Sequence, residues 1–271
     1  MSGEDPRVLI AIGDNCLDLF VERDVVTAGG NALNVAAQWR LAGHAARYFG
    51  AVGDDAEGGL MLAAIAAAGL DPADVEILRG ETAVTRLVGE GGERRFLEER
   101  LGVGAHYLPS FERLAAAAGA GWVHLGTNTK PELVQRLRAA GVRFSVDLST
   151  REPAFALEGV ALAVASAETA AAQPKLEALR QAGAQAALVT CGAHGAWFDD
   201  GVQVWRVAAE PVEVMDTCGA GDSFIAAFTA AWGVEGRAAQ VSLRQAARAA
   251  AATGRHVGGF PQRVTAPPAK G

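Results

Sequence analysis

The sequence predicts an α/β fold in which a mostly parallel sheet lies between two layers of helices. Six apolar runs have the length of strands and lack clean alternation, as strands covered on both faces do. These runs are residues 8–12, 47–52, 122–125, 143–146, 160–165 and 186–190. Segments with helical spacing at 60–68, 132–140 and 175–182 are closed by Gly69, Gly141 and Gly183, where helices commonly end. Because strands and helices alternate, helices are expected on both faces of the sheet.

Composition narrows the class of protein. The 271 residues are 50% hydrophobic and 20% charged, which is enough for a buried core and excludes a disordered chain. Thirty-one acidic residues against 24 Lys and Arg give a net charge of −7, the wrong sign for neutralising the phosphates of a nucleic acid. No G-x-x-x-x-G-K-[S/T] loop and no run of eighteen apolar residues is present, so neither a P-loop nor a membrane span is expected.

The cysteines indicate the compartment. Cys16, Cys191 and Cys218 lie far apart and form no C-x-x-C, so neither a zinc site nor a disulfide framework is expected. The sequence begins with acidic residues before a short apolar run, unlike a secretory signal. Both observations predict a reducing, cytoplasmic location.

Two β segments depart from the alternating pattern. Residues 82–90 and 94–100 flank Gly91-Gly92 with no helix between them, which predicts a hairpin outside the main sheet. Residues 17–26 also alternate and precede the first helix. We expect residues 17–28 and 79–101 to form a small β lid over the edge where open α/β sheets bind ligands. The remaining pattern predicts a single domain over residues 1–271, with a frayed tail from Gln262.

The segment 212–232 carries the most chemistry. Residues 212–215 predict a strand, 216–221 (DTCGAG) a tight turn and 224–232 the apolar face of a helix. Glycines let successive N–H groups converge at the start of a helix, whose dipole also favours an anion. Asp222 stands in the first turn of this helix, where a carboxylate can accept the proton of a hydroxyl that attacks phosphorus. The alternative is that Asp222 is only a favourable helix charge.

The string Asp216-Thr217-Cys218-Gly219-Ala220-Gly221-Asp222 resembles the D-T-x-G-A-G-D signature of the PfkB carbohydrate kinases. Further motifs match in the order of that family, from about Val8 to about Pro261. They are Gly13-Asp14, Gly29-Gly30-Asn31-Ala32-Leu33-Asn34, Gly53-Asp54-Asp55-Ala56-Glu57-Gly58 and Val189-Thr190-Cys191-Gly192-Ala193-His194-Gly195. The resemblance implies a ribokinase-like three-layer α/β/α fold with a small β lid.

The same resemblance implies roles for individual residues. Asp222 is expected to be the catalytic base, and the backbone amides of Gly219, Ala220 and Gly221 the anion hole. The residues expected to bind substrate are Asp14, Gly30, Asn31, Asn34 and, on the lid, Arg100. The residues expected to bind nucleotide are Thr190, Gly192, Gly195, Thr217 and Gly219. Glu98 and Glu99 are further candidates for contact with the substrate, against the alternative of a solvated lid face.

The implied reaction is transfer of the γ-phosphoryl group of ATP, with Mg²⁺, to a hydroxyl of a sugar or sugar–amine adduct. The motifs are most similar to those of the fructoselysine 6-kinases; fructokinases, ribokinases and nucleoside kinases of this family are alternatives. A monovalent cation such as K⁺ and a homodimer through the lid are left open. Residues 165–169 lack the family's N-x-x-E motif, so no metal ligand is assigned, although Glu168 offers a carboxylate there.

Two other classes compete with a kinase. A non-catalytic sensor of sugar or nucleotide would not need Asp222. A dinucleotide oxidoreductase would need G-x-G-x-x-G after the first strand, and Gly13-Asp14-Asn15 does not supply it.

Overall fold

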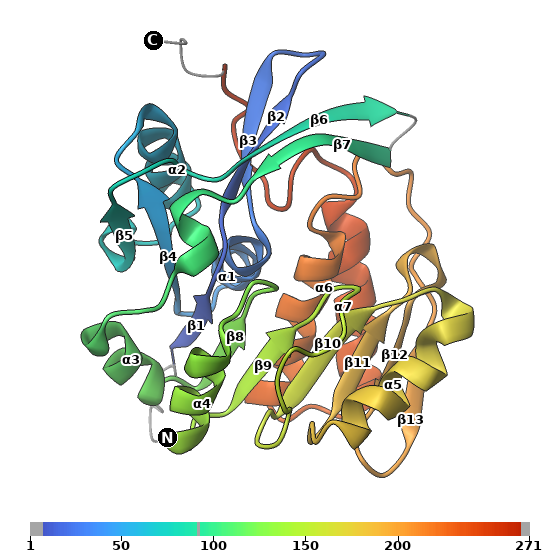
Figure 1. Cartoon of the computed structure of the whole chain (residues 1–271). Coiled ribbons are helices and arrows are strands. Elements are labelled where there is room, and N and C mark those ends of the chain that lie inside the picture. The colour runs from blue at the N-terminus through green and yellow to red at the C-terminus, as the bar shows by residue number, and fades with distance from the viewer. Residues whose placement is uncertain (1–7, 91–92, 267–271) are drawn as a thin grey trace, which may run out of the picture.

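A nine-stranded sheet forms the centre of the computed structural model, which describes residues 8–90 and 93–266 (Figure 1). From β5 to β11 every neighbouring pair of strands is parallel, and β12 and β13 add an antiparallel edge. In spatial order the strands are β13 (Val204–Val207), β12 (Ala196–Asp199), β11 (Ala187–Thr190), β10 (Leu162–Ser166), β9 (Phe144–Asp147), β8 (Trp122–Leu125), β1 (Leu9–Ile12), β4 (Ala46–Gly53) and β5 (Val75–Leu78). The predicted α/β class is confirmed.

Helices cover both faces of this sheet and close two apolar cores. One core packs side chains of α1 (Asn31–Leu41), α2 (Ala56–Ala67), α6 (Ala220–Phe228) and α7 (Ala239–Thr253) against one face. The other core packs side chains of α3 (Phe111–Ala118), α4 (Pro131–Ala139) and α5 (Ala172–Gln181) against the opposite face. All four residues of β1 are buried, as its unbroken apolar sequence predicts. None of the helices in the described part of the chain has the length and apolar character of a membrane span.

Four strands form a second, smaller sheet, which is the lid. Its order is β3 (Val25–Gly29), β2 (Cys16–Phe20), β6 (Val84–Glu90) and β7 (Glu93–Arg100). In Figure 1 it lies above the carboxyl ends of the parallel strands. The segments predicted as a lid therefore pair with each other, with β2 and β6 parallel. The predicted turn at Gly91-Gly92 lies outside the described residues.

Two local expectations are wrong. Residues 212–215 form no strand, because the amide of Met215 donates to the carbonyl of Gly254 after α7 (2.8 Å) rather than to a neighbouring strand. The segment from Gln262 is not frayed over its described part, since the Gln262 side chain bonds both the N–H and the C=O of Ala28 (2.7 Å each). Thr265 then pairs with Val26, so this segment extends the edge of the lid.

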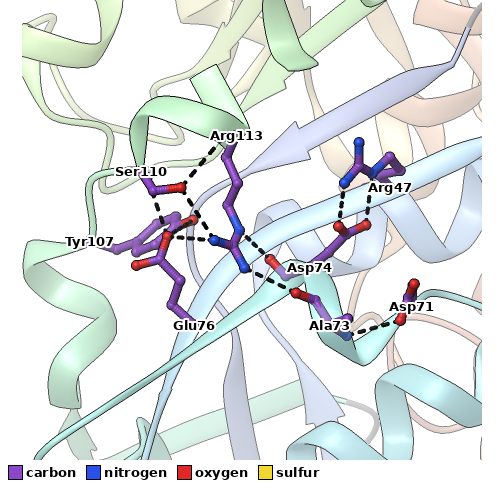
Figure 2. A network of polar contacts seen from close by, with 8 residues as sticks. All are labelled: Arg47, Asp71, Ala73, Asp74, Glu76, Tyr107, Ser110 and Arg113. Atoms are coloured by element: carbon purple, nitrogen blue, oxygen red, sulfur yellow. Dashed lines mark hydrogen bonds and ion pairs between the residues drawn. The ribbon is translucent and has the colours of Figure 1, made fainter. Parts of the chain in front are cut away.

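Ion pairs stabilise the edge of the main sheet that is formed by β5. Arg47 donates to the carboxylate of Asp74 (Nε to Oδ2, 2.9 Å), and Arg113 from α3 pairs with Glu76 of β5 (3.0 Å). Arg113 also donates to the backbone carbonyls of Asp74 (2.9 Å) and Ala73 (3.0 Å), as Figure 2 shows. We call Arg47, Asp74, Glu76 and Arg113 the edge network. It fixes α3 and the short edge strand β5 to the sheet.

Candidate active site

The candidate site lies where the chain reverses the order in which it builds the sheet. From β1 the chain adds β4 and β5 on one side and then returns to place β8 on the other side. Open α/β sheets bind ligands at the carboxyl edge beside such a reversal. Asp14 lies two residues after the end of β1, Asp147 ends β9 and Thr190 ends β11, so all three reach this edge.

The entry to α1 places two amide side chains in the site. Gly30 has φ +110°, and a Cβ there would collide with the backbone of Asn15, so only glycine fits. The first turn of α1 then carries Asn31 and Asn34, three residues apart and on one face of the helix. Asp14 accepts a hydrogen bond from the backbone amide of Asn31 (3.0 Å), which ties the end of β1 to the start of α1.

These two amides hold the carboxylate of Asp222. Asn31 Nδ2 donates to Asp222 Oδ1 and Asn34 Nδ2 to Asp222 Oδ2, both at 2.6 Å. Asn31 Nδ2 also donates to Asp147 Oδ2 at 2.8 Å, so one NH₂ group links two carboxylates. We call Asp14, Asn31, Asn34, Asp147 and Asp222 the carboxylate–amide cluster. It fixes the orientation of Asp222 and leaves lone pairs on both of its oxygens.

Burial and crowding of negative charge shift the proton affinity of the cluster. Burial raises the pKa of Asp222 to about 7, the hydrogen bonds from the two amides oppose this, and the charge of Asp147 adds to it. Burial likewise raises the pKa of Asp147 to about 6, and the pKa of Asp14 is raised for the same reason. A carboxylate whose pKa lies near neutrality is suited to accept and release a proton.

Three acceptors of the cluster have no hydrogen-bond partner. Among the described residues, Asp14 Oδ1, Asn31 Oδ1 and Asn34 Oδ1 are buried and without a donor. Buried polar atoms in native proteins are nearly always bonded, so atoms like these indicate a place for a donor from outside the chain. Hydroxyl groups supply such donors.

The turn before α6 is shaped for an anion. Gly219 has φ +68°, and a Cβ there would collide with the backbone of Gly259, so two glycine backbones pack directly against each other. Asp216 holds this arrangement, since its carboxylate accepts from the amides of Cys218 (3.0 Å) and Gly258 (2.9 Å). The first amides of a helix lack carbonyl partners within the helix and can bind phosphate. One of the three backbone amides expected in the anion hole, that of Ala220, already has a hydrogen-bond acceptor within the chain, the carbonyl of Thr217 at 3.3 Å.

A cleft of about 1190 Å³ adjoins this turn. Thr190, Gly192 and Gly195, from the end of β11 and the turn to β12, lie on one side, and Thr217 lies beside α6. Apolar side chains of α6 and α7, among them Phe224, Ala247 and Ala250, form the remaining wall. Four of the five residues expected to bind nucleotide therefore line one cleft, and Gly219 borders it through its neighbour Ala220.

The structure brings some of the expected substrate residues together and leaves one apart. Asp14, Asn31 and Asn34 join Asp222 in one cluster, and Gly30 shapes the entry to α1. Arg100 lies on β7, where its guanidinium pairs with Glu81 (3.2 Å) and Glu98 (3.8 Å) on the lid. Its expected contact with substrate stays a prediction.

Sequence reasoning missed Asp147 and Gly259. Asp147 is the last residue of β9, which was expected to end one residue earlier. A polar residue at the carboxyl end of a parallel strand could have identified it as a candidate site residue. A Cβ on Gly259 would collide with the Asn34 side chain, so this glycine leaves room for the cluster. A Gly-Gly pair after the last helix carries no local sign of that role.

Comparison with known proteins gives a consistent answer. The family model described as pfkB family carbohydrate kinase matches residues 8–147 and 148–261. The Fructoselysine 6-kinase of Shigella flexneri is 34% identical over 233 residues, covering 83% of this chain and 89% of that protein. The Fructosamine kinase FrlD of Bacillus subtilis (strain 168) is 30% identical over 256 residues, covering 90% of each chain. A ribokinase from Arabidopsis thaliana, solved with ribose and ATP, superposes with a TM-score of 0.79 at 21% identity, covering 94% of each chain.

The three-layer fold with its lid is therefore the ribokinase-like fold, and here it carries a carboxylate in the first turn of a glycine-led helix. The match over most of the chain makes the assignment narrower: the protein belongs to the pfkB family of carbohydrate kinases. The predicted family and the predicted class of enzyme are confirmed.

Proposed function

We propose that this enzyme transfers the γ-phosphoryl group of ATP to a primary hydroxyl of a sugar–amine adduct of the fructoselysine type. The observation that carries the reaction is the carboxylate of Asp222, which the side-chain amides of Asn31 and Asn34 hold in the first turn of α6. The substrate class is supported by the relatives named fructoselysine 6-kinase and fructosamine kinase.

In the proposed reaction Asp222 acts as the general base. The acceptor hydroxyl of the substrate donates a hydrogen bond to the Asp222 carboxylate and transfers its proton to it as the hydroxyl oxygen attacks phosphorus. Asn31 and Asn34 keep the carboxylate in one orientation, which holds the hydroxyl in line with the transferred group. The amides at the start of α6 bind the phosphoryl oxygens as charge develops on them.

The unbonded acceptors account for recognition of a sugar. Hydroxyl groups of the substrate would donate to Asp14 Oδ1, Asn31 Oδ1 and Asn34 Oδ1. A site that buries such acceptors rejects molecules lacking the matching hydroxyls, because the acceptors would then stay unpaired. ATP would occupy the 1190 Å³ cleft, with its phosphates toward Gly219 and Gly221.

Magnesium is proposed to enter with the phosphates of ATP. Within residues 8–90 and 93–266 no three His, Cys, Asp or Glu side chains lie close enough to hold a metal by themselves. Magnesium commonly uses one or two carboxylates together with phosphate and water, and Glu168 places a carboxylate on the wall of the cleft. The ion would neutralise charge on the transferred group. A monovalent cation and a homodimer through the lid stay predictions.

The test is release of ADP from ATP and Mg²⁺ with fructoselysine, fructose, ribose and a nucleoside as acceptors. We expect kcat/KM for fructoselysine to exceed that for fructose by about tenfold or more, since one charge-assisted contact contributes that much. Equal or better activity on fructose, ribose or the nucleoside would overturn the substrate class. Sugar binding with no ADP release from any acceptor would indicate a sensor.

A further inference from the structure

One face of the lid carries a row of polar side chains across all four strands. Thr27 of β3 pairs with Asp18 of β2, Asp18 pairs with Thr85 of β6, and Thr85 pairs with Glu99 of β7. Side chains of directly paired residues point to the same face of a sheet. The Cys16 thiol confirms the shared face, because it lies 3.0 Å from the hydroxyl of Thr85. We call Thr27, Asp18, Thr85 and Glu99 the lid row.

Two residues of the lid row, Asp18 and Thr27, lie close to the turn that precedes α6. The thiol of Cys218 donates to Asp18 Oδ2 at 3.8 Å, and Cys218 belongs to the turn that precedes α6. Thr27, which pairs with Asp18, is also close to this region, since a methyl group on Gly258 would lie 3.7 Å from Cβ of Thr27. Cys218 and Gly258 are the two residues whose amides the Asp216 carboxylate holds. Asp18 and Thr27 therefore lie against the turn that leads into α6, and the first turn of α6 carries Asp222.

The opposite face of the lid has different chemistry. On this opposite face, Arg86 lies 3.8 Å from Glu98, and Arg100 pairs with Glu98 and Glu81. Nearer the core, Leu17 and Val84 of that face are buried among apolar side chains. Glu98 and Glu99 are neighbours in sequence, but they face opposite sides of the strand. Only Glu99 shares a face with Asp18.

The lid row is negatively charged and contains an unbonded polar atom. Asp18 and Glu99 are acidic, and no Lys or Arg stands in the row. Thr27 is 1% exposed, and its hydroxyl oxygen has no hydrogen-bond partner. Burial first, and then the charges of Asp18, Asp14 and Glu99, raise the pKa of the Cys16 thiol to about 12. In the row, Thr27 and Thr85 are buried, Asp18 is half-buried and Glu99 is exposed.

We propose that the lid row is the subsite for the cationic amine of a sugar–amine substrate, with Asp18 pairing with the secondary ammonium next to the sugar. This inference rests on the proposed function. The Thr27 hydroxyl accepts a hydrogen bond from the same region of the substrate, and Glu99 lies farther out along the arm. Two carboxylates with a buried hydroxyl suit a cation that donates hydrogen bonds, and they disfavour a phosphate or carboxylate. A plain ketose has no group for this subsite.

The first test uses the unaltered enzyme with two matched acceptors. One is fructose carrying a propylamino group at carbon 1, and the other is the corresponding propyl ether, which has nearly the same shape but no charge. We expect kcat/KM for the amine to exceed that for the ether by about tenfold or more. Equal rates would overturn the subsite, while activity on both acceptors would leave the sugar-kinase assignment intact.

The second test compares Asp18→Asn with Glu22→Gln, a control in the exposed turn between β2 and β3 of the lid. Asp18→Asn should lower the amine-to-ether ratio of kcat/KM about tenfold, mainly through KM of the amine, and Thr27→Val should lower it less. Glu22→Gln should leave the ratio unchanged. The thermal midpoint Tm of each variant establishes that it is folded. If folded Asp18→Asn keeps the same amine-to-ether ratio of kcat/KM, the subsite is overturned. If the unaltered enzyme phosphorylates no fructosamine at all, the proposed function is overturned instead.

Discussion

The edge network and the carboxylate–amide cluster both join charged or polar side chains from distant parts of the chain, but they differ in how fully these groups are bonded. In the edge network, Arg47 and Arg113 satisfy the carboxylates of Asp74 and Glu76 and two backbone carbonyls (Figure 2). In the cluster, three carboxyl groups crowd together and three buried acceptors have no donor. A buried unbonded polar atom costs free energy, so we expect the cluster to reduce stability and to gain its partners from substrate.

The largest effect is expected for Asp222→Asn. This change removes the proton acceptor but preserves the shape, so kcat should fall about a hundredfold or more while nucleotide binding stays. Steady-state kinetics and ATP titration measure the two quantities. Tm should fall little or rise, because one of three crowded carboxyl groups becomes neutral. Turnover near that of the unaltered enzyme would contradict the role of Asp222 as the base.

A change in the edge network should lower the stability of the fold and leave the activity unchanged. Arg113→Met keeps the aliphatic length but removes the ion pair with Glu76 and the bonds to two carbonyls. Because the Arg113 and Glu76 side chains are less than a quarter exposed, we expect the free energy of unfolding to fall by about 1–3 kcal/mol. Denaturant titration measures this, and kcat/KM should be unchanged at a temperature where the variant is folded. A large loss of kcat/KM would mean that the two regions are coupled.

The smallest effect is expected for Asp147→Asn, in the pH dependence. Asp222 must be deprotonated to act as a base, so kcat/KM should rise with pH through about 7. The negative charge of Asp147 raises the pKa of Asp222, and Asp14 adds to this, while Arg151 acts on Asp14 in the opposite direction. Removing the charge of Asp147 should therefore move the midpoint to lower pH, by less than about one unit. A midpoint that moves upward would contradict the argument.

The same shifts predict how stability depends on pH. Asp147 and Asp222 have higher pKa values in the folded protein than in the unfolded chain, where such groups titrate near about 4. The folded state therefore binds protons more tightly, and this contribution to stability is present at low pH and is lost as pH rises from about 4 to 7. Asp147→Asn should flatten this part of the Tm profile. Arg113→Met, the matched change in the edge network, should lower the whole profile without flattening it.

Much of the fold could be predicted because the parallel strands carry their own signal. The apolar run 122–125 coincides with β8, and the runs at 8–12 and 186–190 each differ from their strands by one residue. The expected strand at 212–215 was wrong, because alternating apolar residues there line a cleft and bond to the chain after α7 rather than to the sheet. Local pattern does not distinguish these two environments.

The candidate site could be predicted only where its residues lie in motifs. Asp14, Asn31, Asn34 and Asp222 lie in glycine-containing motifs that are visible in the sequence, and the structure brings all four together. Asp147 and the lid row depend on strand register, which is fixed by pairing between segments that are far apart. The alternation that separates Glu99 from Glu98 can be read only after β7 is aligned with β6.

The bond between Gln262 and Ala28 has a consequence for the order in which the molecule folds. The two residues are separated by 234 positions, and Asn31 and Asp222 by 191, so both contacts close very long loops of chain. Contacts of such high sequence separation have a large entropic cost of closure and slow the folding of a chain. We expect the sheet to be largely formed before the lid edge and the carboxylate–amide cluster meet. Catalytic competence would then be acquired in the last stage of folding, after most secondary structure is in place.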